Sequence, residues 1–195
     1  FSLHHFARTF EVYIRGEQQW LEKGGDPHRL KAVASLFLSR VDTLADKKLD
    51  ALGTPAALAL RGKTAVAVAK LAYQRYQDFF MGDEYFGYLR AHKVRPQYLL
   101  WASSGTKNPA YGDLLYVEPL IGSDTINTLP DKTLAALVER GQAAARVTEG
   151  TEESQAQFDD LSRLGIDMEH VGFGLQRDGV DLFQQAFDKL LAQTA

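Results

Sequence analysis

Polar side chains that could bind a phosphate follow an apolar run near the middle of the sequence. Tyr98–Ala102 has the length and bulk of a strand that is buried on both faces. Four polar residues come soon after it: Ser103, Ser104, Thr106 and Lys107. In parallel α/β folds, ligands bind at the carboxyl ends of the strands, because the loops that leave the strands converge there. Hydroxyl donors and an ammonium group therefore predict an anion site, and a phosphate suits them.

A second group with the same chemistry follows an earlier apolar stretch, residues 31–38. Ser35 and Phe37 lie at the end of this predicted strand, and Arg40 comes just beyond it. Because parallel strands end at the same edge of a sheet, we expect Arg40 and Lys107 to face the same end. A guanidinium fork and a lysine point charge can together neutralise and orient a phosphate dianion.

Both cations have other interpretations. Arg40 could be an exposed cation at the start of a helix, paired with Asp42 or Asp46, and Lys107 could be an ordinary surface lysine. Lys107 could also form a Schiff base if burial lowered the pKa of its amine. It lies in a loop just before Asn108, which predicts an exposed side chain, so we favour the phosphate role.

Composition bounds the possible functions. The chain has 195 residues, 45% of them hydrophobic, which predicts one ordinary globular domain. A net charge of −3 without a basic stripe argues against a nucleic-acid surface. The absence of cysteine excludes disulfides and thiolate sites and fits a cytoplasmic location. There is no apolar run long enough to span a membrane, and the scattered histidines predict no metal site.

Hydrophobic periodicity divides the chain into alternating strands and helices. Strands are predicted over residues 31–38, 98–102 and 124–129. About eight helices are predicted, over residues 3–23, 41–52, 56–80, 84–92, the start of 111–121, 133–140, 152–164 and 168–193, with glycines interrupting the last one. This βα alternation favours parallel strand pairing.

Three parallel strands are too few to close a barrel. A complete (β/α)8 barrel also needs about 250 residues, more than this chain has. We therefore expect an α/β fold that forms the later part of such a TIM barrel. Residues 1–195 would be the C-terminal portion of a single barrel domain. The chain also opens on Phe1 without an initiator methionine and leads at once into a helical pattern, so we expect the earlier strands to precede Phe1.

Four segments resemble transaldolase in its longer bacterial subfamily, which also occurs fused to glucose-6-phosphate isomerase. They are residues 32–43, 60–74, 100–109 and 124–130, and they occur in the order of the family. The resemblance implies transfer of a dihydroxyacetone unit from sedoheptulose 7-phosphate to glyceraldehyde 3-phosphate, which gives erythrose 4-phosphate and fructose 6-phosphate. It implies no cofactor. The Schiff-base lysine and its acidic partners would lie upstream of Phe1, so the resemblance implies no catalytic residue on this chain and a partner in the N-terminal half of the same barrel.

The resemblance also implies roles for the phosphate-binding residues. The family pattern Ser-x-Phe-x-x-Arg matches Ser35, Phe37 and Arg40, where the serine and arginine contact substrate and the aromatic ring lines the pocket. In relatives whose seventh strand ends in Ala-Ser-x-Arg-Asn, the arginine is a second phosphate ligand. This chain has an insertion there, with Lys107 before Asn108, so either Ser103 or Ser104 could match the family serine.

Two other functions remain open from the sequence. One is a non-catalytic helical interaction module built around residues 56–80, in which the strands are only core. The other is the transaldolase part of a bifunctional transaldolase and isomerase.

Overall fold

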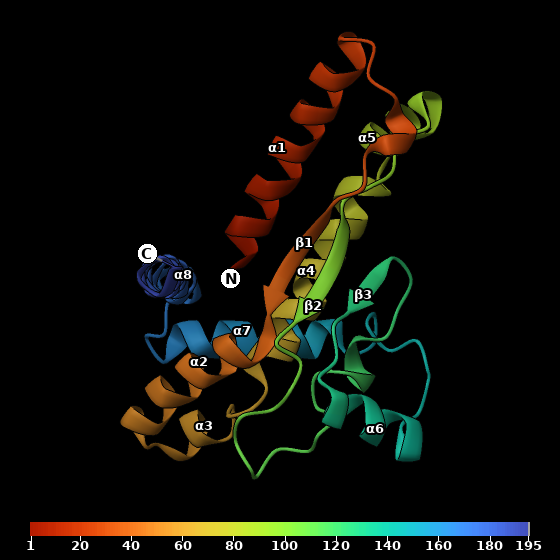
Figure 1. Cartoon of the computed structure of the whole chain (residues 1–195). Helices are drawn as coiled ribbons and strands as arrows, with labels where there is room; N and C mark the ends of the chain where they lie inside the picture. The colour runs from red at the N-terminus through yellow and green to blue at the C-terminus, as the bar shows by residue number, and fades with distance from the viewer. Residues whose placement is uncertain (195) are drawn as a thin grey trace.

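A three-stranded parallel sheet lies at the centre of the computed structural model, which describes residues 1–194 apart from the side chains of Asp83, Glu84 and Phe86 (Figure 1). Its strands are β1 (Val33–Phe37), β2 (Tyr98–Ala102) and β3 (Thr125–Asn127), in the order β1-β2-β3. All three predicted strands are thus confirmed, and so is their parallel pairing.

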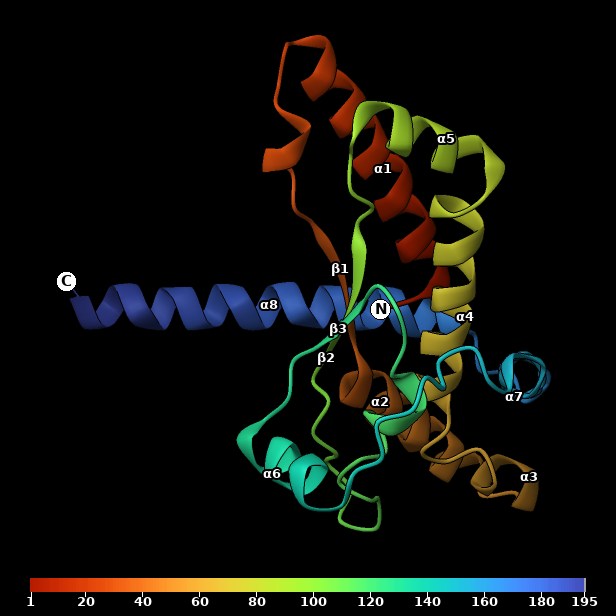
Figure 2. The same cartoon turned by 90° about the vertical axis from the view of Figure 1, so that its right-hand side faces the viewer.

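The two faces of the sheet differ in what covers them. Leu36 on β1 and Trp101 on β2 point into the hydrophobic core and are almost fully buried. Figure 2 shows α4 (Thr64–Phe80) beside the sheet. On the opposite face, Val33 is 41% exposed and Ile126 is 42% exposed. One face of the sheet is therefore covered by helices, and the other is largely uncovered within the described residues.

Most of the remaining described chain is helical. Besides α4, the helices are α1 (Leu3–Glu22), α2 (Leu38–Leu52), α3 (Pro55–Leu58), α5 (Asp83–His92), α6 (Asp131–Arg140), α7 (Thr151–Arg163) and α8 (Met168–Thr194), with short 3-10 helices at Pro27–Arg29 and Glu118–Leu120. In Figure 2, α6 and the C-terminal part of α8 lie on the side of the sheet away from α4. The helix α4 packs against α1, α2 and α7. Large buried aromatic side chains fill this region: Phe10, Tyr76, Phe80 and Trp101.

The predicted long helix over residues 56–80 is wrong, because the chain breaks between α3 and α4. Gly62 adopts a left-handed conformation with φ of 69°. The new N-terminus of α4 is then capped from another helix, since Asp42 Oδ1 accepts a hydrogen bond from Ala65 N at 2.7 Å. The high helical propensity of an alanine-rich segment could not reveal a cap that comes from outside the segment.

Several other helix predictions also differ from the structure, and the helix predicted from residue 133 begins at Asp131. The helix α2 begins at Leu38 rather than Val41, directly at the end of β1. Residues 111–121 contain turns and a 3-10 helix but no α-helix. The glycines of α8 do not interrupt it, and Gly172 instead allows close contact with Ser2, since an added Cβ would lie 2.7 Å from the Ser2 Cβ.

The helix α8 leaves the rest of the structure and extends well beyond the sheet (Figure 2). Residues 180–194 are exposed throughout. They include large apolar side chains, with Phe183 77% exposed and Phe187 59% exposed. Among residues 1–194, no helix combines the length and apolar character that crossing a membrane requires.

Candidate functional site

A cavity of about 390 Å³ lies at the carboxyl end of the sheet, between the start of α2, the loop after β2 and α8. Three cations line it, Arg40, Lys47 and Lys107, and Asp178 is the acid among its described lining residues. This excess of positive charge in a concave site favours an anionic ligand. The structure thus brings Arg40 and Lys107 to one cavity, as the alignment of parallel strand ends predicts.

Arg40 sits in the first turn of α2 and is folded over an aromatic ring. Its Cζ lies 5.2 Å from the centre of the Phe37 ring, a cation–π distance. The Phe37 ring also stacks on Phe1, with 5.2 Å between ring centres. Ser35 lies two residues before Phe37 in β1, so both side chains project from the uncovered face of the sheet. The structure therefore brings Arg40 and Phe37 into contact, whereas Ser35 lies in the middle of β1 and does not line the cavity.

The alternative in which Arg40 pairs with Asp42 or Asp46 is wrong. Arg40 is exposed and forms no ion pair with a described acidic residue, because both aspartates face the other side of α2 and bind other groups. Asp42 Oδ2 accepts from the Tyr116 hydroxyl at 2.7 Å, and Asp46 Oδ2 accepts from the Tyr111 hydroxyl at 2.5 Å. The guanidinium of Arg40 is thus available to a ligand.

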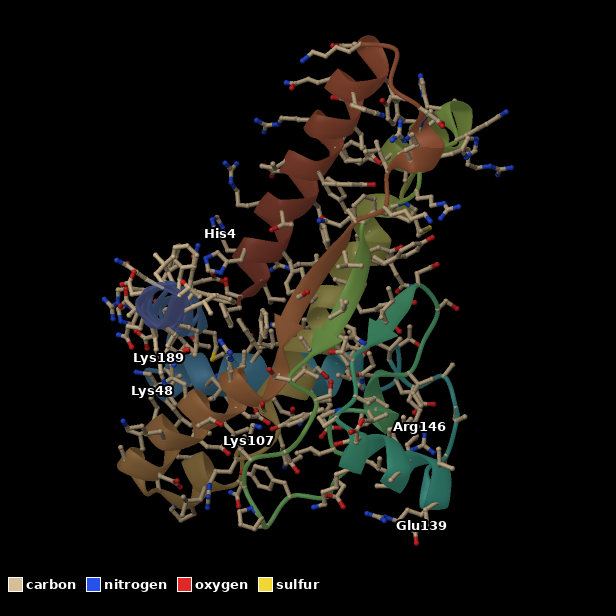
Figure 3. The ribbon with its side chains drawn as sticks, in the orientation of Figure 1. His4, Lys48, Lys107, Glu139, Arg146 and Lys189 are labelled. Carbon is tan, nitrogen blue, oxygen red and sulfur yellow. The ribbon has the colours of Figure 1, made fainter. Side chains whose placement is uncertain are left out.

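Lys107 is exposed and lies in the loop that follows β2, beside α2 (Figure 3). Within the described part of the chain it forms no ion pair. This exposed position matches the expectation from its place in a loop. It suits a phosphate ligand rather than a Schiff-base nucleophile, which needs a desolvated amine.

The two adjacent serines after β2 have different surroundings. Ser103 is half-buried, adopts φ of 54° and uses its carbonyl to accept a hydrogen bond from Ser39 N at 3.2 Å. Ser104 is fully buried, and its hydroxyl contacts Asn127 Oδ1 of β3 and, at 3.4 Å, the Trp101 carbonyl. Ser104 therefore ties two strands together, and Ser103 is better placed to reach a ligand.

Sequence reasoning missed two features of the cavity. Lys47 lines it one turn beyond Thr43, a position that helical spacing from Arg40 could have indicated. Ser39 also lines it and is 2% exposed, and its hydroxyl has no hydrogen-bond partner in the structure. A buried unpaired hydroxyl is unusual and is available to a ligand. Nothing in the sequence distinguishes this serine from its neighbours.

Burial shifts the pKa values of two groups near α2. Burial raises the pKa of Asp42 to about 6, although hydrogen bonds from Tyr116 and Ala65 oppose the shift. Burial and the nearby Asp46 carboxylate raise the pKa of Tyr111 to about 12, so its hydroxyl stays protonated and donates. The described residues contain no group of three or more His, Asp or Glu arranged to hold a metal ion.

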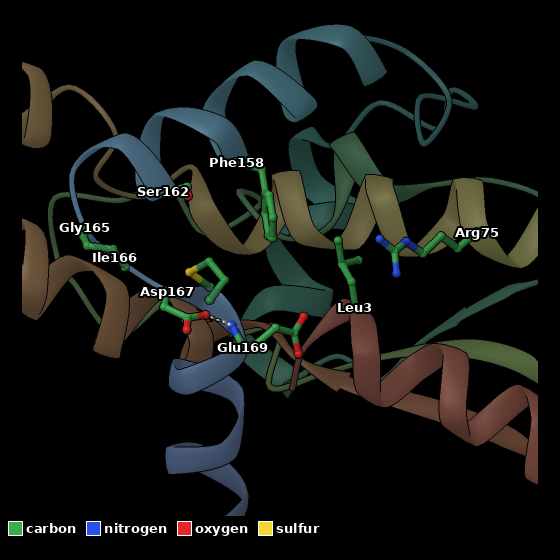
Figure 4. Close-up of a pocket in the computed structure, with 9 residues that line it drawn as sticks. Leu3, Arg75, Phe158, Ser162, Gly165, Ile166, Asp167 and Glu169 are labelled. Carbon is green, nitrogen blue, oxygen red and sulfur yellow. Dashed lines mark hydrogen bonds between the residues drawn. The ribbon is translucent and has the colours of Figure 1, made fainter.

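A second cavity, of about 380 Å³, lies where α1, α7 and α8 meet (Figure 4). Its acidic side chains accept hydrogen bonds near the starts of α8 and α1. Asp167 Oδ1 accepts from Glu169 N at 2.8 Å, and Glu169 Oε2 accepts from the Ser2 hydroxyl at 2.6 Å. Arg75 also lines it, but no residue of the predicted phosphate site does. The cavity at the carboxyl end of the sheet is therefore the better candidate site.

Comparison with known proteins assigns the family. The family model for transaldolase/fructose-6-phosphate aldolase matches residues 1–194. A transaldolase of Thiobacillus denitrificans is 52% identical over 193 residues, which cover 99% of this chain and 54% of that protein. A transaldolase of Neisseria meningitidis is 44% identical over 98% of this chain and 52% of that protein. A transaldolase of Mycolicibacterium smegmatis is 42% identical over 100% of this chain and 52% of that protein.

The chain thus spans about half the length of the curated relatives it matches. The matches run along essentially its whole length, including both strand ends that carry the cations. The chain therefore belongs to the transaldolase/fructose-6-phosphate aldolase family.

Proposed function

We propose that this chain is the phosphate-binding part of a cytoplasmic transaldolase of the pentose phosphate pathway. The observation that carries the proposal is the cavity at the carboxyl end of the sheet, which Arg40 and Lys107 both line while neither forms an ion pair with a described acidic residue. The enzyme would transfer a dihydroxyacetone unit from sedoheptulose 7-phosphate to glyceraldehyde 3-phosphate, and it would release erythrose 4-phosphate and form fructose 6-phosphate. No cofactor takes part in the proposed reaction.

The residues of the site would act on the phosphate group. The Arg40 guanidinium offers a planar pair of donors, and Lys107 adds a point charge. Ser103 supplies a hydroxyl group just after β2, Ser35 supplies one from the middle of β1, and Phe37 holds the Arg40 side chain over its ring. Ser104 would contribute indirectly, through its contacts with Asn127 and Trp101. Binding energy from the phosphate would orient the distant carbonyl carbon of the ketose for reaction.

The proposed active form is a complete (β/α)8 barrel. Two features of this chain support a partner that supplies the other strands. Both β1 and β3 pair only with β2 among the described residues, which leaves two sheet edges open. The apolar side chains on the uncovered sheet face and along α8 also need a covering surface. The N-terminal half of the same barrel would provide it, together with the lysine that forms the Schiff base.

Substitution of Arg40 tests the phosphate role. In the enzyme that contains this chain, we expect Arg40→Ala to weaken the use of fructose 6-phosphate by about 100-fold, because charge-assisted bonds to a phosphate contribute about 3 kcal/mol. Unphosphorylated dihydroxyacetone as donor should lose little. Arg29→Ala is the matched control, since Arg29 is also exposed but precedes β1 instead of following it. Equal losses for both donors would contradict the assignment.

Trapping of the covalent intermediate tests whether the Schiff-base lysine lies outside this chain. Borohydride reduces the imine that an amine and a ketose form with loss of water. With fructose 6-phosphate, we expect the stable adduct on a lysine outside residues 1–195. A stable adduct on Lys107 would show that this exposed lysine is the nucleophile and would overturn the proposed role.

A further inference from the structure

The loop that carries Lys107 is attached to α2 on both sides of that residue. Before Lys107, the Ser103 carbonyl accepts a hydrogen bond from Ser39 N at 3.2 Å. After it, the Tyr111 hydroxyl donates to Asp46 Oδ2 at 2.5 Å. Lys107 therefore lies in a short segment with both ends held on the helix that carries Arg40.

The two aspartates of α2 act as a pair. They are four residues apart and so lie on one face of the helix, and both are buried, with Asp42 1% exposed and Asp46 8% exposed. Asp46 Oδ1 accepts from Gly62 N at 3.0 Å, and Asp42 Oδ1 accepts from Ala65 N at 2.7 Å. Their other oxygens hold Tyr111 and Tyr116. Asp46 thus joins α2 to the segment before α4, and Asp42 joins it to the first turn of α4, while both also bind the loop after β2.

Close packing reinforces the attachment at Tyr111. The ring of Tyr111 lies against Gly62, where an added Cβ would come within 2.8 Å of the ring. The left-handed conformation of Gly62 presents its N–H to Asp46 and leaves room for the ring. The glycine therefore allows Asp46 and Tyr111 to meet.

Lys107 borders both the proposed ligand site and this network. It lines the cavity of about 390 Å³ together with Arg40. It also lines a neighbouring cavity of about 330 Å³, whose other lining residues include Asp42, Asp46, Tyr111 and Tyr116. A free loop would let an exposed lysine sample many positions, and that freedom would be lost on binding an anion. Fixing the loop beforehand reduces this loss.

We propose that Asp42 and Asp46 are positioning residues, which hold Lys107 beside Arg40 by binding Tyr116 and Tyr111. They touch no ligand themselves and act through the loop. This inference rests on the proposed phosphate role of Lys107 and Arg40, and it adds the residues that make the lysine effective.

A double-mutant cycle separates positioning from a general contribution to folding. We would titrate the enzyme that contains this chain with fructose 6-phosphate and follow binding by NMR. Tyr111→Phe keeps the ring and removes one hydrogen bond, so we expect affinity to fall about three- to tenfold. In a Lys107→Ala background, Tyr111→Phe should cause no further loss, whereas in an Arg40→Ala background its loss should persist.

Two further variants sharpen the test. Tyr116→Phe, which acts on Asp42, should show the same dependence on Lys107 if both aspartates position the loop. Tyr13→Phe is the matched control, because its hydroxyl also makes one hydrogen bond, to the Arg95 carbonyl at 2.9 Å, but at the other end of the sheet. It should leave the affinity unchanged.

The outcomes distinguish this inference from the function on which it rests. Equal losses from Tyr111→Phe in the Lys107→Ala and Arg40→Ala backgrounds would assign the network to folding alone and overturn the positioning role. Unchanged affinity in both tyrosine variants would also overturn it. If neither Arg40→Ala nor Lys107→Ala affects fructose 6-phosphate binding, the proposed phosphate site itself is wrong.

Discussion

Buried acidic side chains at the two ends of the sheet differ in their hydrogen-bond partners. At the carboxyl end, Asp42 and Asp46 each accept two hydrogen bonds, and the nearby cations remain free for a ligand. Towards the amino end, Glu17 on α1 is 2% exposed, and neither of its carboxylate oxygens has a partner at hydrogen-bonding geometry. The neighbouring Tyr13 hydroxyl donates to the Arg95 carbonyl instead.

The pKa values reflect this difference. Burial raises the pKa of Glu17 from 4.5 to about 7 against a smaller opposing effect of the Tyr13 hydroxyl, and it raises the pKa of Asp42 from 3.8 to about 6 against the opposing effect of two hydrogen bonds. The comparison teaches that burial alone does not tell whether an acid supports the fold. Asp42 connects three segments of the chain, whereas the desolvation cost of ionised Glu17 exceeds what the neighbouring Tyr13 hydroxyl offsets.

Removal of the Asp42 carboxylate should change the stability of the fold most among the substitutions considered. Asp42→Ala leaves the buried Tyr116 hydroxyl and the Ala65 N–H without their acceptor, so we expect the free energy of unfolding to fall by about 3 kcal/mol. Urea denaturation measures this. Asp42→Asn, which retains one oxygen acceptor, should lose less. A loss in Asp42→Ala below about 0.5 kcal/mol, the range of ordinary surface substitutions, would contradict the role of the carboxylate.

Substitution of Glu17 should instead increase the free energy of unfolding at neutral pH and above. Because its pKa is higher in the folded state, the folded chain holds a proton that the unfolded chain releases, and stability falls as the pH rises from about 4.5 to about 7. Glu17→Gln should therefore raise the free energy of unfolding by about 1 to 3 kcal/mol at pH 8 and have little effect at pH 4. The readout is the difference between denaturation curves at the two pH values.

An exposed acid on the same helix provides the control for Glu17. Glu22→Gln should change stability little at either pH, because its side chain is in solvent. If Glu17→Gln destabilised the chain equally at both pH values, the glutamate would have a partner that supports the fold, and the contrast between the two ends would disappear.

The smallest expected difference in stability is between alanine substitutions at two glycines. Gly62 and Gly24 both adopt left-handed conformations, with φ of 69° and 77°, so alanine should cost about 1 kcal/mol of backbone strain at either position. Only at Gly62 would the new Cβ meet a neighbour, the Tyr111 ring. Gly62→Ala should therefore cost about 1 kcal/mol more than Gly24→Ala in thermal unfolding. Equal costs would mean that the Tyr111 ring moves aside freely.

Sequence patterns predicted the sheet well because its strands depend on local composition. The apolar run of β2 is bounded by polar residues, and its predicted and observed limits agree at Tyr98 and Ala102. The break between α3 and α4 was missed, since it depends on Gly62 in a left-handed conformation and on a cap from Asp42, a residue of another helix. Local helical propensity contains neither kind of information.

By itself, the sequence determined the parallel strands, the placement of Arg40 and Lys107 after two of them, and a resemblance that the family comparison confirms. These follow from local polarity and from the rule that parallel strands end together. Only the tertiary structure decided that Asp42 and Asp46 bind tyrosines rather than Arg40, and that Ser104 is buried while Ser103 is nearer the surface. Those choices depend on which side chains distant segments bring within hydrogen-bonding distance, and spacing along the chain does not contain that information.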